Sequence, residues 1–145
     1  MPAVRAFIDS NVLIYALLED DPKKQLISRR LLSEIVPVVS PQILLESTNV
    51  LVRRASVGPA DAARLLRAFV DGEVVPVTGQ TVREAWRIAD RYGFQIYDAT
   101  VVAAAIGSKC QTLYTEDLQD GQRIESLRIV NPFSSKDEVK NWLPD

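Results

Sequence analysis

Short apolar runs alternate with longer helix-like segments along most of this chain, and this alternation constrains the fold more than any other feature. The runs that are typical of buried strands cover residues 4–8, 36–39, 73–77, 111–115 and 127–132. The segments that predict helices cover residues 11–18, 23–35, 41–54, 60–70, 78–92 and 98–107. Strands that alternate with helices form a mainly parallel sheet covered on both faces. The sequence therefore predicts an α/β fold, a three-layer sandwich with a sheet of four to five strands flanked by helices.

Several helix boundaries carry residues suited to capping. Ser10 or Asn11 is expected to cap the first helix, and Ser40 is expected to cap the third. Gly93 is expected to end the fifth helix, because glycine readily adopts the left-handed conformation found there. With 145 residues, the chain has the length of one domain. We expect this domain to span residues 1–133 and a polar tail, which contains Trp142 and Leu143, to span residues 134–145.

The composition excludes several chemistries. The chain has no histidine and a single cysteine, Cys110. A Ser–His or Cys–His nucleophile pair is therefore excluded, as is a zinc site built on imidazole or several thiolates. An intramolecular disulfide is also excluded, which indicates a reducing, cytoplasmic location. No apolar run approaches the roughly 18 residues of a membrane span, so no membrane association is expected.

The charge balance permits contact with phosphate without demanding it. The formal net charge is −2, so no overall basic field indicates nucleic acid. Arginine nevertheless supplies 12 of the 17 basic residues, and its planar guanidinium group suits phosphate. Arg53 and Arg54 lie two turns after Glu46 and are expected to contact phosphates of a nucleic-acid substrate. Any catalysis must use carboxylates, hydroxyls, Lys, Arg, Tyr or bound ions.

Acidic residues stand where the predicted strands end and helices begin. Asp9 follows the first strand, and Glu116 and Asp117 follow the strand over residues 111–115. Asp98 opens a helix that has almost no polar face, where its alternative role is that of an N-cap. In open α/β sheets, ligands bind beyond the carboxyl ends of the strands. We therefore expect these acids to come close together. Asp120 precedes a glycine and alternatively makes a turn.

A cluster of this kind calls for a cation. Two like charges about 4 Å apart repel by roughly 4 kcal/mol at an effective dielectric constant of 20. Mg²⁺ and Mn²⁺ prefer carboxylate and water oxygens, so either ion would stabilise such a pocket. Glu46 shares a helix face with Asn49 and Arg53, and the alternative for this residue is an ordinary solvated face.

Four stretches of the sequence, in their order along the chain, resemble the PIN domain family: FIDSNVLIYA, SPQILLESTNVL, YGFQIYDATVVAAAI and LYTEDLQDG. The closest likeness is to the VapC-type toxins of bacterial toxin–antitoxin pairs. This resemblance implies a PIN-like fold, an Mg²⁺- or Mn²⁺-dependent endoribonuclease activity, a small antitoxin partner and a homodimer. The apolar helices over residues 23–35 and 60–70 are candidate partner surfaces, although core packing explains them equally well.

The resemblance also assigns roles to residues. The acidic quartet of the family falls on Asp9, Glu46, Asp98 and Asp117. We expect Asp9 and Asp98 to bind the metal directly, Asp117 to bind it directly or through water, and Glu46 to hold a second ion or orient the attacking water. The supporting positions fall on Ser10, Asn11, Thr115 and Glu116. Asp120 falls where the family varies.

Two other functions remain open at this point. A haloacid dehalogenase-type phosphatase also begins with a strand that ends in Asp, but it needs a second Asp two residues later, where this chain has Asn11. It also needs a central Lys, for which Lys109 is the candidate. The other alternative is a catalytically silent PIN-like binding module.

Overall fold

A six-stranded sheet forms the middle layer of the structure, a computed structural model that describes residues 3–134. The strand order is β3-β2-β1-β4-β6-β5. The first five strands in this order run parallel, and β5 pairs with β6 in the antiparallel direction. The strands are β1 (Arg5–Ile8), β2 (Val36–Val39), β3 (Glu73–Val74), β4 (Thr112–Tyr114), β5 (Arg123–Ile124) and β6 (Leu127–Val130). The predicted α/β class is confirmed, although the sheet has one strand more than the four to five expected.

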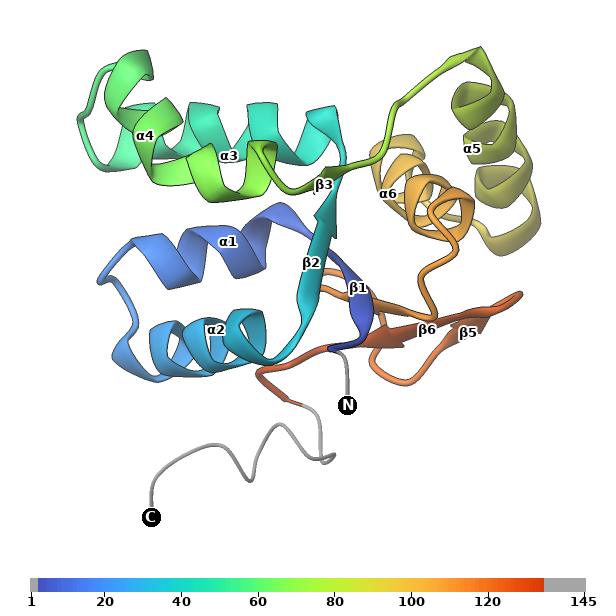
Figure 1. Cartoon of the computed structure of the whole chain (residues 1–145). Helices are drawn as coiled ribbons and strands as arrows, with labels where there is room; N and C mark the ends of the chain where they lie inside the picture. Colours follow the sequence, from blue (N-terminus) through green and yellow to red (C-terminus); the bar gives the residue numbers. More distant parts are fainter. Residues whose placement is uncertain (1–2, 135–145) are drawn as a thin grey trace.

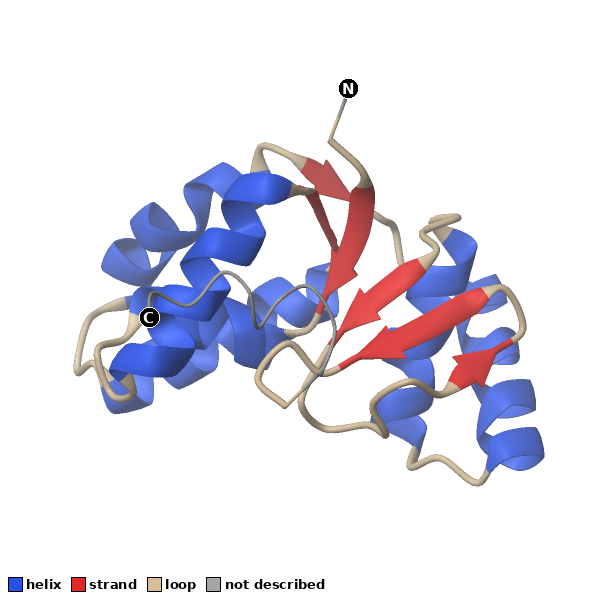
Figure 2. Cartoon of the chain, turned by 90° about the horizontal axis from the view of Figure 1, so that it is seen from below, coloured by secondary structure: helices blue, strands red, loops and turns tan. Residues whose placement is uncertain are grey.

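Helices cover both faces of this sheet (Figure 1). They are α1 (Ser10–Leu17), α2 (Pro22–Glu34), α3 (Pro41–Arg54), α4 (Pro59–Val70), α5 (Gly79–Tyr92) and α6 (Ile96–Gly107). Figure 2 shows the strands between the group formed by α1 to α4 and the pair formed by α5 and α6. Helix α6 contacts β4, and α2 and α4 contact β2. The predicted tail lies outside the described residues, except for its first residue, Ser134.

The core is apolar on both faces of the central strands. Phe7 and Ile8 of β1 are fully buried, as are Leu13 of α1 and Leu113 of β4. Because β1 lies in the middle of the sheet with helices on both sides, its apolar run is continuous rather than alternating. The carboxyl end of β1 is therefore a protected position, and the chain places Asp9 there.

Two strands differ from the sequence prediction for physical reasons. Strand β3 is predicted over residues 73–77 but covers only Glu73 and Val74, followed by one more hydrogen bond to β2, from the Val75 N–H to the Val39 carbonyl. Pro76 has no N–H to donate to the sheet, so the pairing ends before it. Strand β5 was not predicted, because its two residues form no apolar run and depend on pairing with β6.

Other boundaries follow the expected caps. The Ser40 hydroxyl accepts a hydrogen bond from the Ile43 N–H at the start of α3. Gly93 ends α5 with a φ of 74°, a left-handed conformation that favours glycine. Both predictions are confirmed: Ser40 begins the helix that carries Glu46, and Gly93 ends the helix that precedes α6, which carries Asp98.

Candidate functional site

Asp9 and Thr115 leave the sheet side by side. Strands β1 and β4 are parallel, and Ile8 lies next to Tyr114 in their register. The following residues therefore meet at the carboxyl edge of the sheet. The Thr115 hydroxyl donates a hydrogen bond of 2.8 Å to Oδ2 of Asp9. Asp9 is only 6% exposed, so this contact stabilises a carboxylate that is largely removed from water.

Asp9 also caps helix α1, which corrects the prediction that Ser10 or Asn11 does so. Its Oδ1 accepts a hydrogen bond of 2.7 Å from the Ser10 N–H. The helix begins at Ser10, one residue earlier than predicted. Asp9 is the last residue before the helix, and its backbone is extended. The side chains of Ser10 and Asn11 are therefore released from capping and contact other residues of the site.

Burial raises the pKa of the Asp9 carboxyl to about 6. The hydrogen bonds from Thr115 and from the Ser10 N–H oppose this shift, whereas the negative charges of Asp117 and Glu46 add to it. A carboxylate with a raised pKa, held at the edge of a parallel sheet, is a recognised mark of a functional site.

Asp98 lies in the first turn of α6 and does not cap it, so the alternative of an N-cap role is wrong. Helix α6 begins at Ile96, and the Gln95 side chain caps it by accepting hydrogen bonds from the N–H groups of Tyr97 and Asp98. The Asp98 carboxylate is left free for another partner. Burial raises its pKa, and the charges of Asp117 and Glu46 raise it further.

Glu46 of α3 is held on the site side of its helix. Its Oε2 accepts a hydrogen bond of 3.3 Å from the Ser10 hydroxyl, and its Oε1 accepts one of 2.9 Å from Gln42 Nε2. Asn49 and Arg53, which share its predicted face, are exposed. This polar face of α3 is therefore partly exposed to solvent, as the helical periodicity predicts. Glu46 on the same face contacts Ser10 of α1.

Asp117 is held in the loop after β4. Its N–H donates to the Thr115 hydroxyl at 3.1 Å, and its Oδ2 accepts a bond of 3.2 Å from Asn11 Nδ2. Asn11 Nδ2 also donates to the Thr115 hydroxyl at 3.3 Å. Thr115 and Asn11 therefore connect Asp9 to Asp117 through hydrogen bonds.

The four predicted acids share one region of the fold. Asp9 and Asp98 each lie close enough to both Asp117 and Glu46 for their charges to raise the pKa. Within residues 3–134, no Lys or Arg forms an ion pair with any of the four. Across the same residues, no three Asp, Glu, His or Cys side chains are arranged as a metal-binding group. Hydrogen bonds to their own neighbours direct the carboxylates of Asp9, Glu46 and Asp117.

Glu116 points away from these acids. Its Oε1 accepts a hydrogen bond of 2.7 Å from the Tyr15 hydroxyl, and its Oε2 pairs with Lys24 Nζ at 2.9 Å. The hydrogen bond to Glu116 raises the pKa of the Lys24 ammonium group to about 12. Sequence reasoning missed Tyr15 and Lys24. Tyr15 lies one turn after Asn11, a weak signal, whereas Lys24 resembles any lysine near the start of a helix.

The remaining predicted residues lie around this region. Asp120 accepts a hydrogen bond of 2.9 Å from the Asn131 N–H, which joins the loop after β4 to the end of β6. Arg54 forms an ion pair with Asp20. Arg54 also lines a cavity of about 190 Å³ together with Ser10 and Asn11. Arg53 does not line this cavity, and both arginines are exposed.

The donor set suits a hard divalent cation. Carboxylate oxygens predominate, and hydroxyl and amide groups support them, which is the chemistry that Mg²⁺ and Mn²⁺ prefer.

None of the helices among residues 3–134 is both long and apolar enough to cross a membrane.

Comparisons with known proteins identify the family. Residues 6–123 match the PIN domain. A search of curated proteins finds no match. Among solved structures, the chain is similar to VapC20 of Mycobacterium tuberculosis, described as a sarcin–ricin loop cleaving toxin, with 24% identity and a TM-score of 0.64 over 77% of this chain and 91% of that one.

Two further solved structures agree. A toxin–antitoxin complex from Klebsiella pneumoniae gives 18% identity and a TM-score of 0.67 over 88% of this chain and 97% of that one. VapBC2 from Rickettsia felis, bound to a DNA fragment from its promoter, gives 16% identity and a TM-score of 0.62 over 87% and 97%. At these identities, the structures support the fold, and the family match extends over most of the sequence. This chain belongs to the PIN domain family.

Proposed function

We propose that this protein is a divalent-metal-dependent endoribonuclease that hydrolyses RNA phosphodiester bonds, and that it acts in the cytoplasm as the toxin of a toxin–antitoxin pair. One observation carries the proposal. Asp9 and Asp98 each lie within electrostatic reach of Asp117 and Glu46 beside the carboxyl edge of the sheet, and no Lys or Arg of residues 3–134 pairs with any of the four. A bound cation would stabilise such a group of carboxylates by offsetting the repulsion between their negative charges.

The four acids fit Mg²⁺ or Mn²⁺ by their chemistry. A bound ion would lower the pKa of a water molecule and stabilise negative charge on the phosphoryl oxygens. Binding requires rotation of the side chains, since no three acids of residues 3–134 are already arranged around an ion. Of the hydrogen bonds that hold these side chains, those from Asn11 to Asp117 and from Ser10 to Glu46 are the longer ones, at 3.2 and 3.3 Å, whereas Gln42 donates to Glu46 at 2.9 Å.

Each residue of the site has a proposed role. Asp9 and Asp98 hold the ion directly, Asp117 holds it directly or through water, and Glu46 holds a second ion or orients the attacking water. Thr115 and Asn11 fix the directions of Asp9 and Asp117 through their hydrogen bonds, as partners of metal ligands commonly do. Arg54, beside the cavity next to Ser10 and Asn11, contacts an RNA phosphate.

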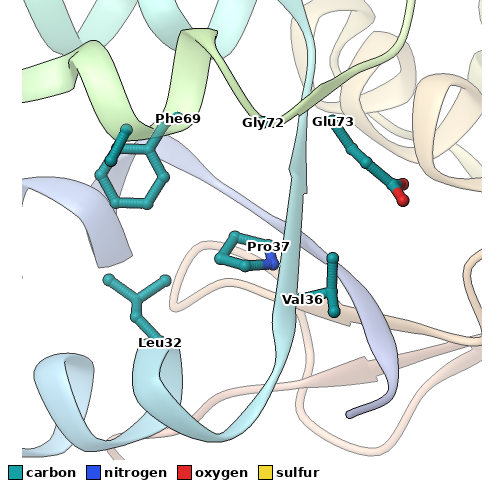
Figure 3. A pocket seen from close by; sticks show the side chains of 7 residues that line it. Leu32, Val36, Pro37, Phe69, Gly72 and Glu73 are labelled. Carbon is teal, nitrogen blue, oxygen red and sulfur yellow. The ribbon is translucent and has the colours of Figure 1, made fainter. Parts of the chain in front are cut away.

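The partner we propose is a small antitoxin protein. Two of the similar structures are toxin–antitoxin assemblies. The chain offers an apolar cavity of about 330 Å³ between α2, β2 and α4, which an apolar antitoxin segment would fill. In Figure 3, Leu32 and Phe69 face this space on either side of Pro37. The cavity lies between the two helices that the sequence singles out as partner surfaces.

A homodimer is the proposed assembly. Large apolar side chains are exposed on α3, α5 and α6, among them Leu45, Trp86 and Tyr97. Trp86 and Tyr97 are each more than 60% exposed. Aromatic residues are enriched at protein interfaces, so these helices are the surface on which a second copy of the chain would bind.

The phosphatase alternative is disfavoured by the position of Lys109. This residue precedes β4, whereas Asp9 follows β1, and the two strands are parallel. Lys109 therefore lies at the opposite edge of the sheet from Asp9. Asn11, which stands in place of the second phosphatase Asp, is engaged with Thr115 and Asp117.

The decisive experiment measures cleavage of a labelled single-stranded RNA with Mn²⁺, with Mg²⁺ and with excess EDTA. Cleavage is expected with either ion and not with EDTA. Asp9→Asn and Asp98→Asn should abolish it, whereas Asp90→Asn, at an exposed position on α5, should not. Calorimetric titration with Mn²⁺ separates the enzyme from a silent module, because a silent module shows no site that is lost in Asp98→Asn.

A further inference from the structure

Three elements that are distant in the sequence meet at the side chain of Glu116. Lys24 of α2 donates to Oε2 of Glu116 at 2.9 Å, and Tyr15 of α1 donates to Oε1 at 2.7 Å. Lys24 also donates to the Tyr15 hydroxyl at 3.2 Å. The three side chains form a closed triangle of hydrogen bonds, which we call the Lys24–Glu116–Tyr15 cluster. It uses both carboxylate oxygens of Glu116.

Aromatic rings support this cluster. Lys24 Nζ lies 4.6 Å from the centre of the Tyr15 ring and 5.2 Å from that of Phe133, within the range of a cation–π interaction. The two rings pack edge to face, with centroids 5.0 Å apart. The side chains of Lys24 and Glu116 are 31% and 23% exposed, whereas those of the Arg30–Glu34 pair on the same helix are 53% and 46% exposed. The Lys24–Glu116 pair is therefore less exposed to solvent than this surface ion pair, and aromatic rings make additional contacts with it.

The position of Glu116 in the chain gives the cluster its significance. Glu116 lies between Thr115, which donates to Asp9, and Asp117, one of the four site acids. The Glu116 N–H makes a long hydrogen bond of 3.4 Å to Asn11 Oδ1, and Asp117 itself is exposed. The side chain of Glu116 thus adds a second attachment of the loop, to α1 and α2, beside the bonds that Thr115 makes to Asp9 and Val130.

Charge supports the same conclusion. Glu116 would add a fifth negative charge beside four carboxylates, and like charges at this range repel. Lys24 neutralises that charge and draws the side chain toward α2. Glu116 is consequently kept apart from the site acids while its backbone remains next to them.

We propose that Lys24 and Tyr15, acting through Glu116, are positioning residues that hold Asp117 where it can contribute to the metal site. The proposal rests on the proposed metal-dependent function. A cluster that only stabilised the fold would have no influence on metal affinity. A positioning cluster controls both metal affinity and turnover, because supporting partners of metal ligands set the ligand geometry.

The test uses the full chain and measures Mn²⁺ binding, by loss of the free-ion electron paramagnetic resonance signal, together with kcat and KM on a labelled RNA. We expect Lys24→Met and Glu116→Gln each to weaken Mn²⁺ binding and kcat by about tenfold, with KM changed less than twofold. Tyr15→Phe, which keeps the ring against Phe133, should give a smaller loss in the same direction. Arg30→Met, which breaks the exposed pair on the same helix, is the matched control and should change neither quantity.

Two further variants keep a folding defect apart from a positioning defect. The double variant Lys24→Met/Glu116→Gln should be no worse than either single variant, because the two residues act through one contact. The exchange Lys24→Glu/Glu116→Lys restores the ion pair and should recover part of the Mn²⁺ affinity. Circular dichroism melting of every variant identifies the temperature range in which all of them remain folded.

The outcomes separate this inference from the proposed function. If the unaltered protein binds Mn²⁺ and Asp9→Asn does not, but folded Lys24→Met and Glu116→Gln bind it as tightly as the unaltered protein, the positioning role is wrong and the metal site stands. If the unaltered protein shows no Mn²⁺ site, both proposals fail.

Discussion

The Thr115 hydroxyl lies 2.8 Å from Oδ2 of Asp9 and donates a hydrogen bond to it, joining the carboxyl ends of two neighbouring parallel strands. Thr115 is fully buried, and its oxygen also accepts hydrogen bonds from Asn11 Nδ2 and the Asp117 N–H. One hydroxyl group therefore connects the buried carboxylate of Asp9 with the exposed carboxylate of Asp117.

The first prediction concerns this hydroxyl. Thr115→Val keeps the shape of the side chain but leaves Oδ2 of the buried Asp9 carboxylate without its donor, which costs about 1–3 kcal/mol. The pKa of Asp9 should rise further, because the lost hydrogen bond acts to lower it. Urea unfolding at neutral pH measures the stability. Thr48→Val is the control, since the Thr48 hydroxyl bonds only within its own helix, to the carbonyl of Leu44. Equal stability of the two variants would contradict the prediction.

The second prediction concerns Asp9→Asn and stability. The folded pKa of Asp9 is about 6, above its ordinary value of 3.8, so the folded protein binds the proton more tightly than the unfolded chain. Stability from this group is present below pH 4 and is lost as the pH rises through 6. A shift of this size corresponds to about 3 kcal/mol at most. Asn has one acceptor oxygen in place of two, so Asp9→Asn loses one of the two hydrogen bonds at every pH. Its melting temperature relative to that of the unaltered protein should therefore be more favourable at pH 7.5 than at pH 4.5. A difference in melting temperature that is the same at pH 7.5 and pH 4.5 would contradict this reasoning.

The sequence placed Asp9 correctly after the first strand, because a strand followed by an acid is a local pattern. It placed Asp98 near the start of its helix, which begins two residues earlier than predicted, at Ile96. It predicted their capping roles poorly. Three residues in a row, from Asp9 to Asn11, are able to cap, and only the backbone conformation decides among them. At α6, glutamine is not a favoured capping residue, so Asp98 was the expected choice in place of Gln95.

Contacts between distant segments could not be predicted from the pattern. Lys24 and Glu116 are 92 positions apart, and their pairing depends on how α2 packs beside the loop after β4. No local signal distinguishes Lys24 from Lys23, its exposed neighbour. Strand β5 is a similar case, because two residues acquire their structure only from the partner strand β6.

The third prediction concerns the pH dependence of metal binding. A carboxyl group must lose its proton to bind a cation, so Mn²⁺ and protons compete for Asp9. Because the pKa of Asp9 is about 6, Mn²⁺ affinity should be nearly constant above pH 7 and should fall as the pH drops through 6. Calorimetric titrations between pH 5 and 8 measure this dependence. An affinity that stays constant down to pH 5 would exclude Asp9 as a ligand.

The fourth prediction assigns Asp120 a structural role. Its carboxylate accepts a hydrogen bond from the backbone of Asn131, at the end of β6. Asp120→Asn keeps a carbonyl oxygen that can accept this bond, so RNA cleavage should remain within about twofold of the parent and stability within about 0.5 kcal/mol. Asp120→Ala removes the acceptor and should cost about 1 kcal/mol in urea unfolding. If Asp120→Asn loses as much cleavage as Asp117→Asn, Asp120 belongs to the metal site.

The last prediction separates two neighbouring arginines. Both side chains are exposed, but Arg54 lines the cavity beside Ser10 and Asn11 and Arg53 does not. Arg54 forms an ion pair with Asp20 in which both side chains are exposed, so loss of this pair should change the free energy of unfolding little. Arg54→Ala should raise KM for RNA and reduce the slope of log affinity against log salt concentration by about 0.7, the value for one contact with a single-stranded phosphate. Arg53→Ala should change the slope less. RNA binding is measured at several salt concentrations in the Asp9→Asn background, which is expected not to cleave the RNA. Three proteins are compared: Asp9→Asn alone, Asp9→Asn with Arg54→Ala, and Asp9→Asn with Arg53→Ala. Equal slopes for the two arginine variants would show that proximity to the cavity does not determine which side chain contacts the RNA.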